Sequence, residues 1–152
     1  MMVDKKSQEI AMVGIVIDFV DYMKKEETAA PLKEWQKKIK QVAHVLEDSY
    51  FGSLTFKRGE CIYGDVVGTN KKFVTKHGAM QFWGISFAIY KSLGYKVFFG
   101  RSSNPVSTIL LQKLGGIPIS KAYLEGTEEF MELVMIDLEK LKLPSLSCLY
   151  PE

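Results

Sequence analysis

The sequence predicts a single α/β domain built on a mixed β-sheet, and three observations carry that prediction. Two segments typical of buried strands, Glu60–Val67 and Tyr95–Gly100, flank an apolar segment of helical length, Ala79–Leu93. Because a helix between two neighbouring strands returns the chain as a crossover, this stretch predicts a parallel βαβ unit. Two more strand-like segments, Ile117–Tyr123 and Phe130–Leu138, follow it. The length of 152 residues suits one domain with a substantial core.

Composition argues against several classes of protein. Apolar residues make up 47% of the chain and charged residues 25%, as in ordinary soluble domains. A net charge of +2 gives no case for nucleic acid as a partner, and the longest apolar run, Ile10–Ile17, is too short to span a membrane. We place the domain at residues 1–143 and an irregular tail, which holds Pro144 and Pro151, at residues 144–152.

The cysteines and the N-terminal residues predict the compartment. Cys61 and Cys148 are far apart and form no metal-binding spacing, so we expect reduced thiols and no metal site. The start, Met1–Glu9, is polar and lacks the apolar core of a signal peptide. These features predict an intracellular protein, cytoplasmic by default.

The first elements are a strand and an amphipathic helix. Ile10–Val20 is apolar at nearly every position, which predicts a strand buried on both faces. Asp21–Ala30 reads as a charged connection, and Pro31 opens a helix because proline suits the first turn. Its apolar stripe, which we expect to face the core rather than a membrane, consists of Leu32, Trp35, Ile39, Val42, Ala43 and Leu46.

A hairpin is predicted next. Phe51–Phe56 and Glu60–Val67 read as antiparallel strands around the tight turn Lys57–Gly59. Strand alternation puts one set of side chains on one face, Glu60, Ile62, Gly64 and Val66, and the other set opposite, Cys61, Tyr63, Asp65 and Val67. Glu60 and Asp65 are therefore not expected to act as an acid/base pair.

Each of the two following helices comes after a strand and a polar loop. The loop Gly68–Gly78 precedes Ala79–Leu93, and the loop Arg101–Pro105 precedes Val106–Leu114. The first helix is apolar nearly all round, so we expect it to be buried and Trp83 to be a core residue. A helix N-terminus that follows a strand suits a bound phosphate.

Three segments in this order carry a resemblance to a known family. Glu34–Phe51 resembles a helical insertion placed before the fourth strand, and Gly78–Lys96 is similar to an acetyl-coenzyme A helix with its following strand. Ser103–Gly116 resembles an Asn/Ser segment that runs into a Lys-Leu-Gly helix end. Together these segments resemble the GCN5-related N-acetyltransferase superfamily, and most closely its arylalkylamine-type branch, over most of the chain from Ile10 onward.

The resemblance implies a cofactor and a set of contacts. Acetyl-coenzyme A would lie between the splayed ends of Glu60–Val67 and Tyr95–Gly100, with its pyrophosphate at the next helix N-terminus. The contacts implied are Val66, Val67, Lys76, His77, Gly78, Ala79, Met80 and Asn104. Ser103 and Ser107 keep the spacing of a serine pair in this branch, so they are the catalytic candidates. The alternative for both serines is that they cap the following helix.

Departures from the family pattern predict the function. The pyrophosphate motif (Gln/Arg)-x-x-Gly-x-(Gly/Ala) keeps Gly78, but Thr75 replaces its first residue and Met80 its last. Leu111 stands where many members have a tyrosine general acid, and Gly116 replaces a phenylalanine. These departures favour a non-catalytic structural or assembly subunit. The alternative is an acetyl-coenzyme A-dependent N-acetyltransferase acting on a small amine or a protein amine.

The N-terminal region predicts a partner. The family places a strand, two helices and a further strand before the one that matches Ile10–Val20, whereas only about ten residues precede it here. The resemblance thus implies a fold without those first elements. A sheet so trimmed exposes an apolar face and an unpaired edge. We therefore expect a homodimer or a subunit of a larger protein assembly.

Overall fold

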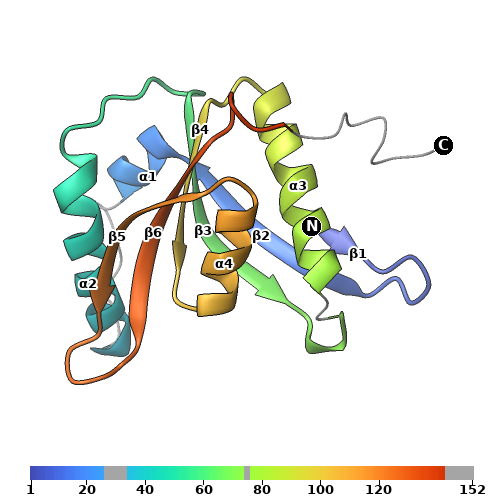
Figure 1. Ribbon diagram of the computed structural model, residues 1–152, viewed down its shortest axis with the longest axis horizontal. Coiled ribbons are helices and arrows are strands. Elements are labelled where there is room, and N and C mark those ends of the chain that lie inside the picture. Colours follow the sequence, from blue (N-terminus) through green and yellow to red (C-terminus); the bar gives the residue numbers. More distant parts are fainter. Residues whose placement is uncertain (26–33, 74–75, 143–152) are drawn as a thin grey trace.

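The structure is a computed structural model that describes residues 1–25, 34–73 and 76–142 (Figure 1). Its strands are β1 (Met2–Val3), β2 (Ile10–Asp18), β3 (Cys61–Thr69), β4 (Val97–Ser102), β5 (Ile117–Tyr123) and β6 (Phe130–Asp137). Its helices are α1 (Phe19–Lys25), α2 (Glu34–Phe51), α3 (Lys76–Ser92) and α4 (Pro105–Lys113), with a short 3₁₀ turn, η2 (Lys71–Phe73). Outside the description lie Pro31, Leu32, Thr75, Cys148, the predicted tail at residues 144–152, and the side chains of Trp35, Lys76 and His77.

The strands form one mixed sheet in the order β1-β2-β3-β4-β6-β5, which confirms the predicted fold class. β3 and β4 are adjacent and parallel, with α3 as the crossover between them, and every other neighbouring pair is antiparallel. The parallel ladder runs from Cys61↔Val97 to Gly64↔Gly100. β3 then continues to Thr69 without β4, so the two strands separate at their carboxyl ends as predicted.

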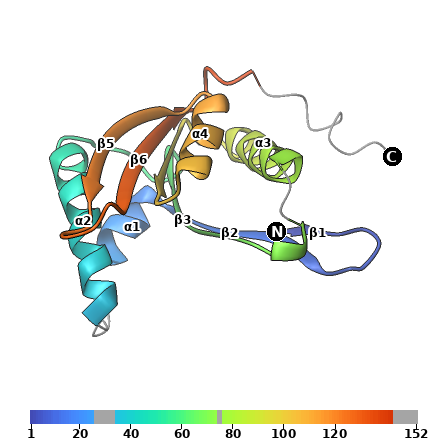
Figure 2. The same cartoon turned by 60° about the horizontal axis from the view of Figure 1, so that its bottom comes forward.

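Helices cover both faces of the sheet. α3 and α4 lie on one face, and α1 and α2 lie on the other (Figure 2). Neighbouring residues of β4 face opposite layers: Phe98 packs with Trp83 of α3, whereas Phe99 packs with Phe19 of α1 and Phe51 of α2. The core therefore consists of two apolar layers that meet at the middle strands.

The later part of the apolar stripe predicted for α2 faces the core, whereas Ile39 is 39% exposed. Val42, Ala43 and Leu46 are buried and pack with Met131 of β6. Among the described helices, none is both long and apolar enough to cross a membrane.

The predicted strand Phe51–Phe56 is wrong, because Phe51 ends α2 and no strand follows before β3. The Phe51 ring lies edge-on to Phe19 at 4.9 Å and to Phe99 at 5.1 Å between ring centroids. Burial of this ring extends the helix by a turn beyond the predicted stripe. The tight turn at Lys57–Gly59 does form, with the Glu60 N–H donating to the Lys57 carbonyl oxygen at 3.1 Å.

The predicted strand Ile10–Val20 is also too long. β2 ends at Asp18, whose carboxylate accepts a hydrogen bond of 3.0 Å from the Val20 N–H and so starts α1. The beginning of the predicted connection Asp21–Ala30 is therefore helical, and its part from residue 26 lies outside the described residues.

Burial of β2 on both faces is wrong for the half of the strand nearest its start. Val13 is 42% exposed and Ile15 53% exposed, whereas Ile17 packs against the α1–α2 layer. Side chains two residues apart in a strand share a face, so Val13, Ile15 and Ile17 lie on the same face of β2. Helices α1 and α2 cover this face at Ile17 and leave Val13 and Ile15 exposed. Figure 2 shows the arm of β2 and β3 reaching past them under α3.

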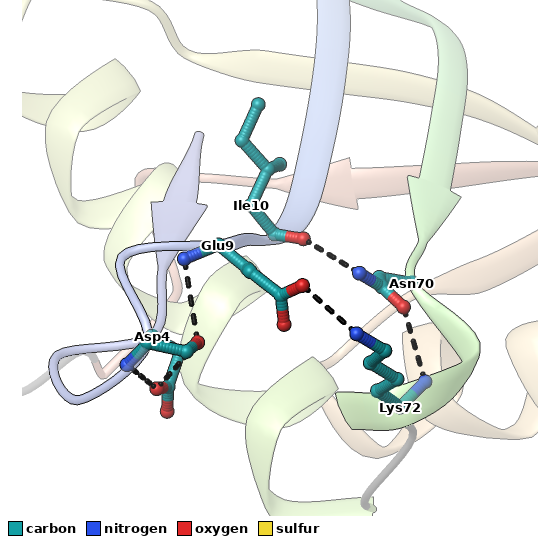
Figure 3. A network of polar contacts seen from close by, with 6 residues as sticks. Asp4, Glu9, Ile10, Asn70 and Lys72 are labelled. Carbon is teal, nitrogen blue, oxygen red and sulfur yellow. Dashed lines mark hydrogen bonds and ion pairs between the residues drawn. The ribbon is translucent and has the colours of Figure 1, made fainter.

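Polar contacts tie the N-terminal hairpin to the end of β3 (Figure 3). The Asn70 side-chain amide donates to the Ile10 carbonyl oxygen at 3.2 Å. Lys72 forms an ion pair of 2.8 Å with Glu9. The sequence did not predict β1, because two residues within a polar segment carry no strand pattern.

Candidate functional site

A cavity of about 510 Å³ opens where β3 and β4 separate. The walls come from β3 and β4 where they separate, from Met12 of β2, and from α3 and α4 with the loop before α4. The strands contribute Met12, Gly64, Asp65, Val66, Val67, Thr69, Phe98, Gly100, Arg101 and Ser102, and the helices with their preceding loop contribute Ala79, Trp83, Ser103, Asn104, Val106, Ser107, Leu110 and Leu111. Most of this lining is apolar.

A β-bulge at Asp65 marks the point of separation. Ile15 of β2 pairs with Val66, whereas the next residue, Val16, pairs with Gly64, so Asp65 has no partner in β2. A bulge bends its strand and increases the local twist, which turns the end of β3 away from β4. It also reverses the predicted alternation, because Val66 now shares a face with the exposed Ile15, and Val67 lies beside Gly14.

Two glycines make room for the aromatic floor of the cavity. A Cβ atom at Gly64 would lie 2.8 Å from the Phe98 ring, and one at Gly100 would also lie 2.8 Å from it. These contacts are shorter than van der Waals separation, so the ring can lie over both strands only because both residues lack a side chain.

A buried polar network meets the cavity from the α1–α2 side. The Arg101 guanidinium lies 3.6 Å from the Asp65 carboxylate and 3.5 Å from the Glu47 carboxylate. Glu47 accepts hydrogen bonds from Tyr22 at 2.9 Å and from Tyr63 at 2.5 Å. Arg101 also lies over the Tyr63 ring, 5.4 Å from its centroid. Four elements, α1, α2, β3 and β4, thus supply one network.

Burial fixes the protonation states in this network. It raises the pKa of Tyr63 and of Tyr22 far above the usual range, so both remain hydroxyl donors near neutral pH. Burial acts to lower the pKa of Arg101, but the surrounding tyrosines and carboxylates outweigh it and the net shift is upward. Glu47 is 5% exposed and accepts the hydroxyl hydrogen bonds of both tyrosines beside the Arg101 guanidinium.

The structure brings most of the predicted site residues to this cavity. Val66, Val67, Ala79, Ser103, Asn104 and Ser107 all line it. Gly78 and Met80 are half-buried in the first turns of α3 and are not part of the lining. Lys76 and His77 begin the same helix, but their side chains lie outside the described part of the chain.

The cap of α4 is Asn104, and neither serine supplies it. The Asn104 side chain accepts a hydrogen bond of 2.8 Å from the Val106 N–H. Ser103 and Ser107 are exposed at the cavity instead. Leu111 is buried in the cavity wall and offers no proton donor there.

Sequence reasoning missed the network of Arg101, Glu47, Tyr22 and Tyr63, and gave Asp65 no role. Its members are scattered over the chain from residue 22 to residue 101, so no local spacing joins them. One usable signal was an arginine at the end of a buried strand, since a buried charge requires a partner. Among the described residues, no three His, Cys, Asp or Glu side chains are placed to hold a metal ion.

The chemistry available is that of a binding cavity with a charged inner end. A long apolar wall suits an extended ligand, and the two helix N-termini at the cavity suit an anionic group. Asp65 and Arg101 lie where the strands part, and the hydroxyls of Ser103 and Ser107 lie on the α4 side.

Comparison with solved structures identifies the fold. The C-terminal condensation domain of Ebony in complex with β-alanyl-dopamine superposes with a TM-score of 0.75 at 10% identity, over 89% of this chain and 70% of that one. Mosquito arylalkylamine N-acetyltransferase like 5b superposes with a TM-score of 0.68 at 16% identity, over 89% of this chain and 72% of that one. Arylalkylamine N-acetyltransferase 2 from Aedes aegypti superposes with a TM-score of 0.69 at 13% identity, over 90% of this chain and 71% of that one.

No protein-family model matches the chain, and no curated protein matches its sequence. The chain has the fold of the GCN5-related N-acetyltransferases in its arylalkylamine-type form. At these identities the likeness concerns the fold alone, and function has to be argued from the cavity.

Proposed function

We propose that this chain binds an acyl-coenzyme A in the cavity between β3 and β4 and presents an amine to its acyl group. One observation carries the proposal: β3 runs on from Gly64 to Thr69 without β4, beside a cavity of about 510 Å³. The backbone groups on that edge of β3 have no ladder partner, so an extended amide-bearing ligand can pair with them as an added strand.

The residues present fit such a ligand at both ends. Ala79 in the first turn of α3 reaches the cavity, so a phosphate group beside it would meet the positive end of a 17-residue helix. Met80, which replaces a small residue of the family motif, is not part of the cavity lining and leaves that approach open. Trp83, Phe98 and Leu110 line the middle of the cavity with apolar surface.

The chain's own groups would position the amine and handle its proton. When bound, acetyl-coenzyme A would supply an activated acyl group in the form of a thioester. The amine would lose one proton as the new C–N bond replaces the C–S bond of the thioester, and the departing thiolate would take one up. The hydroxyls of Ser103 and Ser107 are exposed at the cavity, where they can relay that proton. The walls hold the two reactants together, which is the larger contribution in a direct transfer.

A non-catalytic subunit is the second candidate function. Leu111 favours it, because this buried side chain occupies a position in the cavity wall where a proton donor would assist the leaving group. A chain of this kind would keep the fold, and even the ligand, without turnover.

A protein interface is also proposed for the open face of the β2–β3 arm. Val13, Ile15 and Val66 share this face and are exposed, Val66 by 54%. Contiguous exposed aliphatic side chains favour association with a second copy or with another subunit of an assembly. Sedimentation of the isolated chain tests this: a folded monomer at micromolar concentration would refute it, and Ile15→Lys should abolish any association seen.

Calorimetric titration with acetyl-coenzyme A tests the main proposal. Gly78→Pro removes one N–H donor from the first turn of α3, where proline is compatible with the helix, and we expect it to abolish binding. Gly78→Ala keeps the donor and serves as the matched control. Unchanged affinity in a folded Gly78→Pro variant would rule out this site.

Release of free thiol from acetyl-coenzyme A separates the two candidate functions. With a panel of primary amines, thiol release that depends on the amine favours acyl transfer. Tight binding with no release above the protein-free rate, for every amine, favours the non-catalytic subunit.

A further inference from the structure

Asp65 presents to the cavity a carboxylate that has no hydrogen-bond partner among the described residues. Its side chain is 26% exposed, and its partner among the described residues is Arg101, 3.6 Å away. That separation is an ion-pair distance and is too long for a hydrogen bond. A carboxylate accepts several hydrogen bonds, so the lone pairs of Asp65 remain available to a ligand in the cavity.

The charge of Arg101 does not cancel that of Asp65. Arg101 is shared with Glu47, which is nearly fully buried and already holds two tyrosine hydroxyls. The three groups therefore carry one net negative charge. Among the described lining residues, only Asp65 and Arg101 are charged, so this excess faces the cavity at Asp65.

We infer that Asp65 binds the ammonium form of the acceptor amine and sets the preference of this site for a cation. The inference rests on the proposed function, and it assigns a residue to amine selection. The bound ammonium would lose one proton to water before its nitrogen attacks the acyl group. An ammonium group offers three N–H donors to the free carboxylate oxygens. A neutral molecule of the same shape can donate a hydrogen bond to this carboxylate but forms no ion pair with it, and a carboxylate is repelled.

Glu47 is a positioning residue in this scheme. It lies behind Arg101 and is not part of the cavity lining, yet it holds the charge that would otherwise neutralise Asp65. Removing the charge of Glu47 would leave Arg101 to Asp65 alone. The cavity would then be neutral, and the preference for a cation would be lost without any change in a lining residue.

Titration with benzylamine and with benzyl alcohol, followed by amide NMR shifts near neutral pH, tests the inference. The two probes match in size and differ in charge. We expect the chain to prefer benzylamine by about tenfold, as for one ion pair in a partly buried site. Asp65→Asn and Glu47→Gln should each remove that preference and leave the affinity for benzyl alcohol unchanged.

Tyr22→Phe is the matched control, since it removes one hydroxyl from Glu47 and changes no charge. It should keep the preference. Retention of the preference for benzylamine in Asp65→Asn would overturn the inference. An equal loss of affinity for both probes would also overturn it, because the contact would then not depend on charge. Asp65 is partly exposed, so this variant decides the matter even where Glu47→Gln fails to fold.

Calorimetry with acetyl-coenzyme A distinguishes failure of this inference from failure of the proposed function. If the wild-type chain prefers benzylamine but does not bind acetyl-coenzyme A, the proposed function fails while the ammonium site at Asp65 is supported. If it binds acetyl-coenzyme A but shows no preference between the probes, only the inference is overturned.

Discussion

The two halves of β3 lie in opposite surroundings. Residues 62–64 pair with strands on both sides, Cys61 pairs with β4, and all four are buried. Residues 66–69 pair with β2 alone, the bulge residue Asp65 pairs with neither strand, and all five are exposed or half-buried. The change falls at the bulge of Asp65, within one continuous strand.

This difference shows how one strand serves two purposes. In the first half, hydrogen-bonding groups and side chains are satisfied within the domain, so this half contributes to stability. In the second half, the edge toward β4 is free and Val66 and Val67 line the cavity, while the Val66 side chain shares the open face with Ile15. A ligand that lies along this edge can form hydrogen bonds with the backbone groups of β3 that have no partner in β4. Substitutions in the two halves should therefore separate stability from binding.

Tyr63→Ala should give the largest loss of stability. Tyr63 is fully buried, stacks on Tyr22 with 4.0 Å between ring centroids, and donates to Glu47. Removal of such a ring leaves a cavity and deprives a buried carboxylate of a donor, so we expect a loss of about 3–5 kcal/mol in the free energy of unfolding. Urea denaturation followed by circular dichroism measures it.

Val66→Ala is the control for the second half of β3. Val66 is more than half exposed, so its truncation should cost under about 1 kcal/mol. Similar losses at Tyr63 and Val66 would contradict the division of the strand, because the open half would then carry as much stability as the buried one.

Gly64→Ala should have the next largest effect, at the boundary between the halves. The added methyl group would meet the Phe98 ring at 2.8 Å, and this ring is fully buried and packed against Trp83 and Phe87. Displacing it should cost about 1–3 kcal/mol in the free energy of unfolding. Thermal unfolding of the variant measures the change.

Gly68→Ala provides the matched control in the open half of β3. A methyl group there would meet Val13 at 3.7 Å, an ordinary contact. We expect no loss, or a gain of about 0.4–1 kcal/mol because alanine restricts the unfolded chain. A destabilised Gly68→Ala variant with an unaffected Gly64→Ala variant would reverse the comparison.

The sequence predicted the pieces of the fold that depend on local periodicity. The crossover between β3 and β4 followed from one apolar helix between two strands, and the range Ile117–Tyr123 was right at both ends. The segment Phe51–Phe56 was wrong because aromatic residues suit a strand and a buried helix end equally well. Tertiary packing on Phe19 decides that case, and no local pattern contains it.

The candidate site was predictable in part for the same reason. Asn104, Ser103 and Ser107 follow a strand and open a helix, so their place at the cavity could be expected. The bulge at Asp65 could not be expected from the sequence, because a single extra residue changes neither the composition nor the length of the strand noticeably. Nor could the pairing of Arg101 with Glu47, which joins two elements more than 50 residues apart by a contact of 3.5 Å.

Lys72→Met should have the smallest effect and concerns the far end of β3. Lys72 is paired with Glu9 at 2.8 Å, and both side chains are largely exposed. An exposed pair of this kind contributes about 0.2–1 kcal/mol to the free energy of unfolding. Most of that contribution should vanish near 1 M salt, where the Debye length falls to about 3 Å. Urea denaturation at low and high salt measures both values.

Lys71→Met is the matched control for this last comparison, because Lys71 is equally exposed and has no ion pair with any residue that the structure describes. The hydrogen bonds of Asn70 to the Ile10 carbonyl oxygen and to the Lys72 N–H remain in both variants, so the N-terminal hairpin should stay attached and only the ionic part of the tie should be lost. Equal changes in the Lys71 and Lys72 variants at low salt would mean that the ion pair contributes nothing. The hairpin would then be held to the arm by hydrogen bonds and by the packing of Met2 against the core, with no ionic contribution from Lys72.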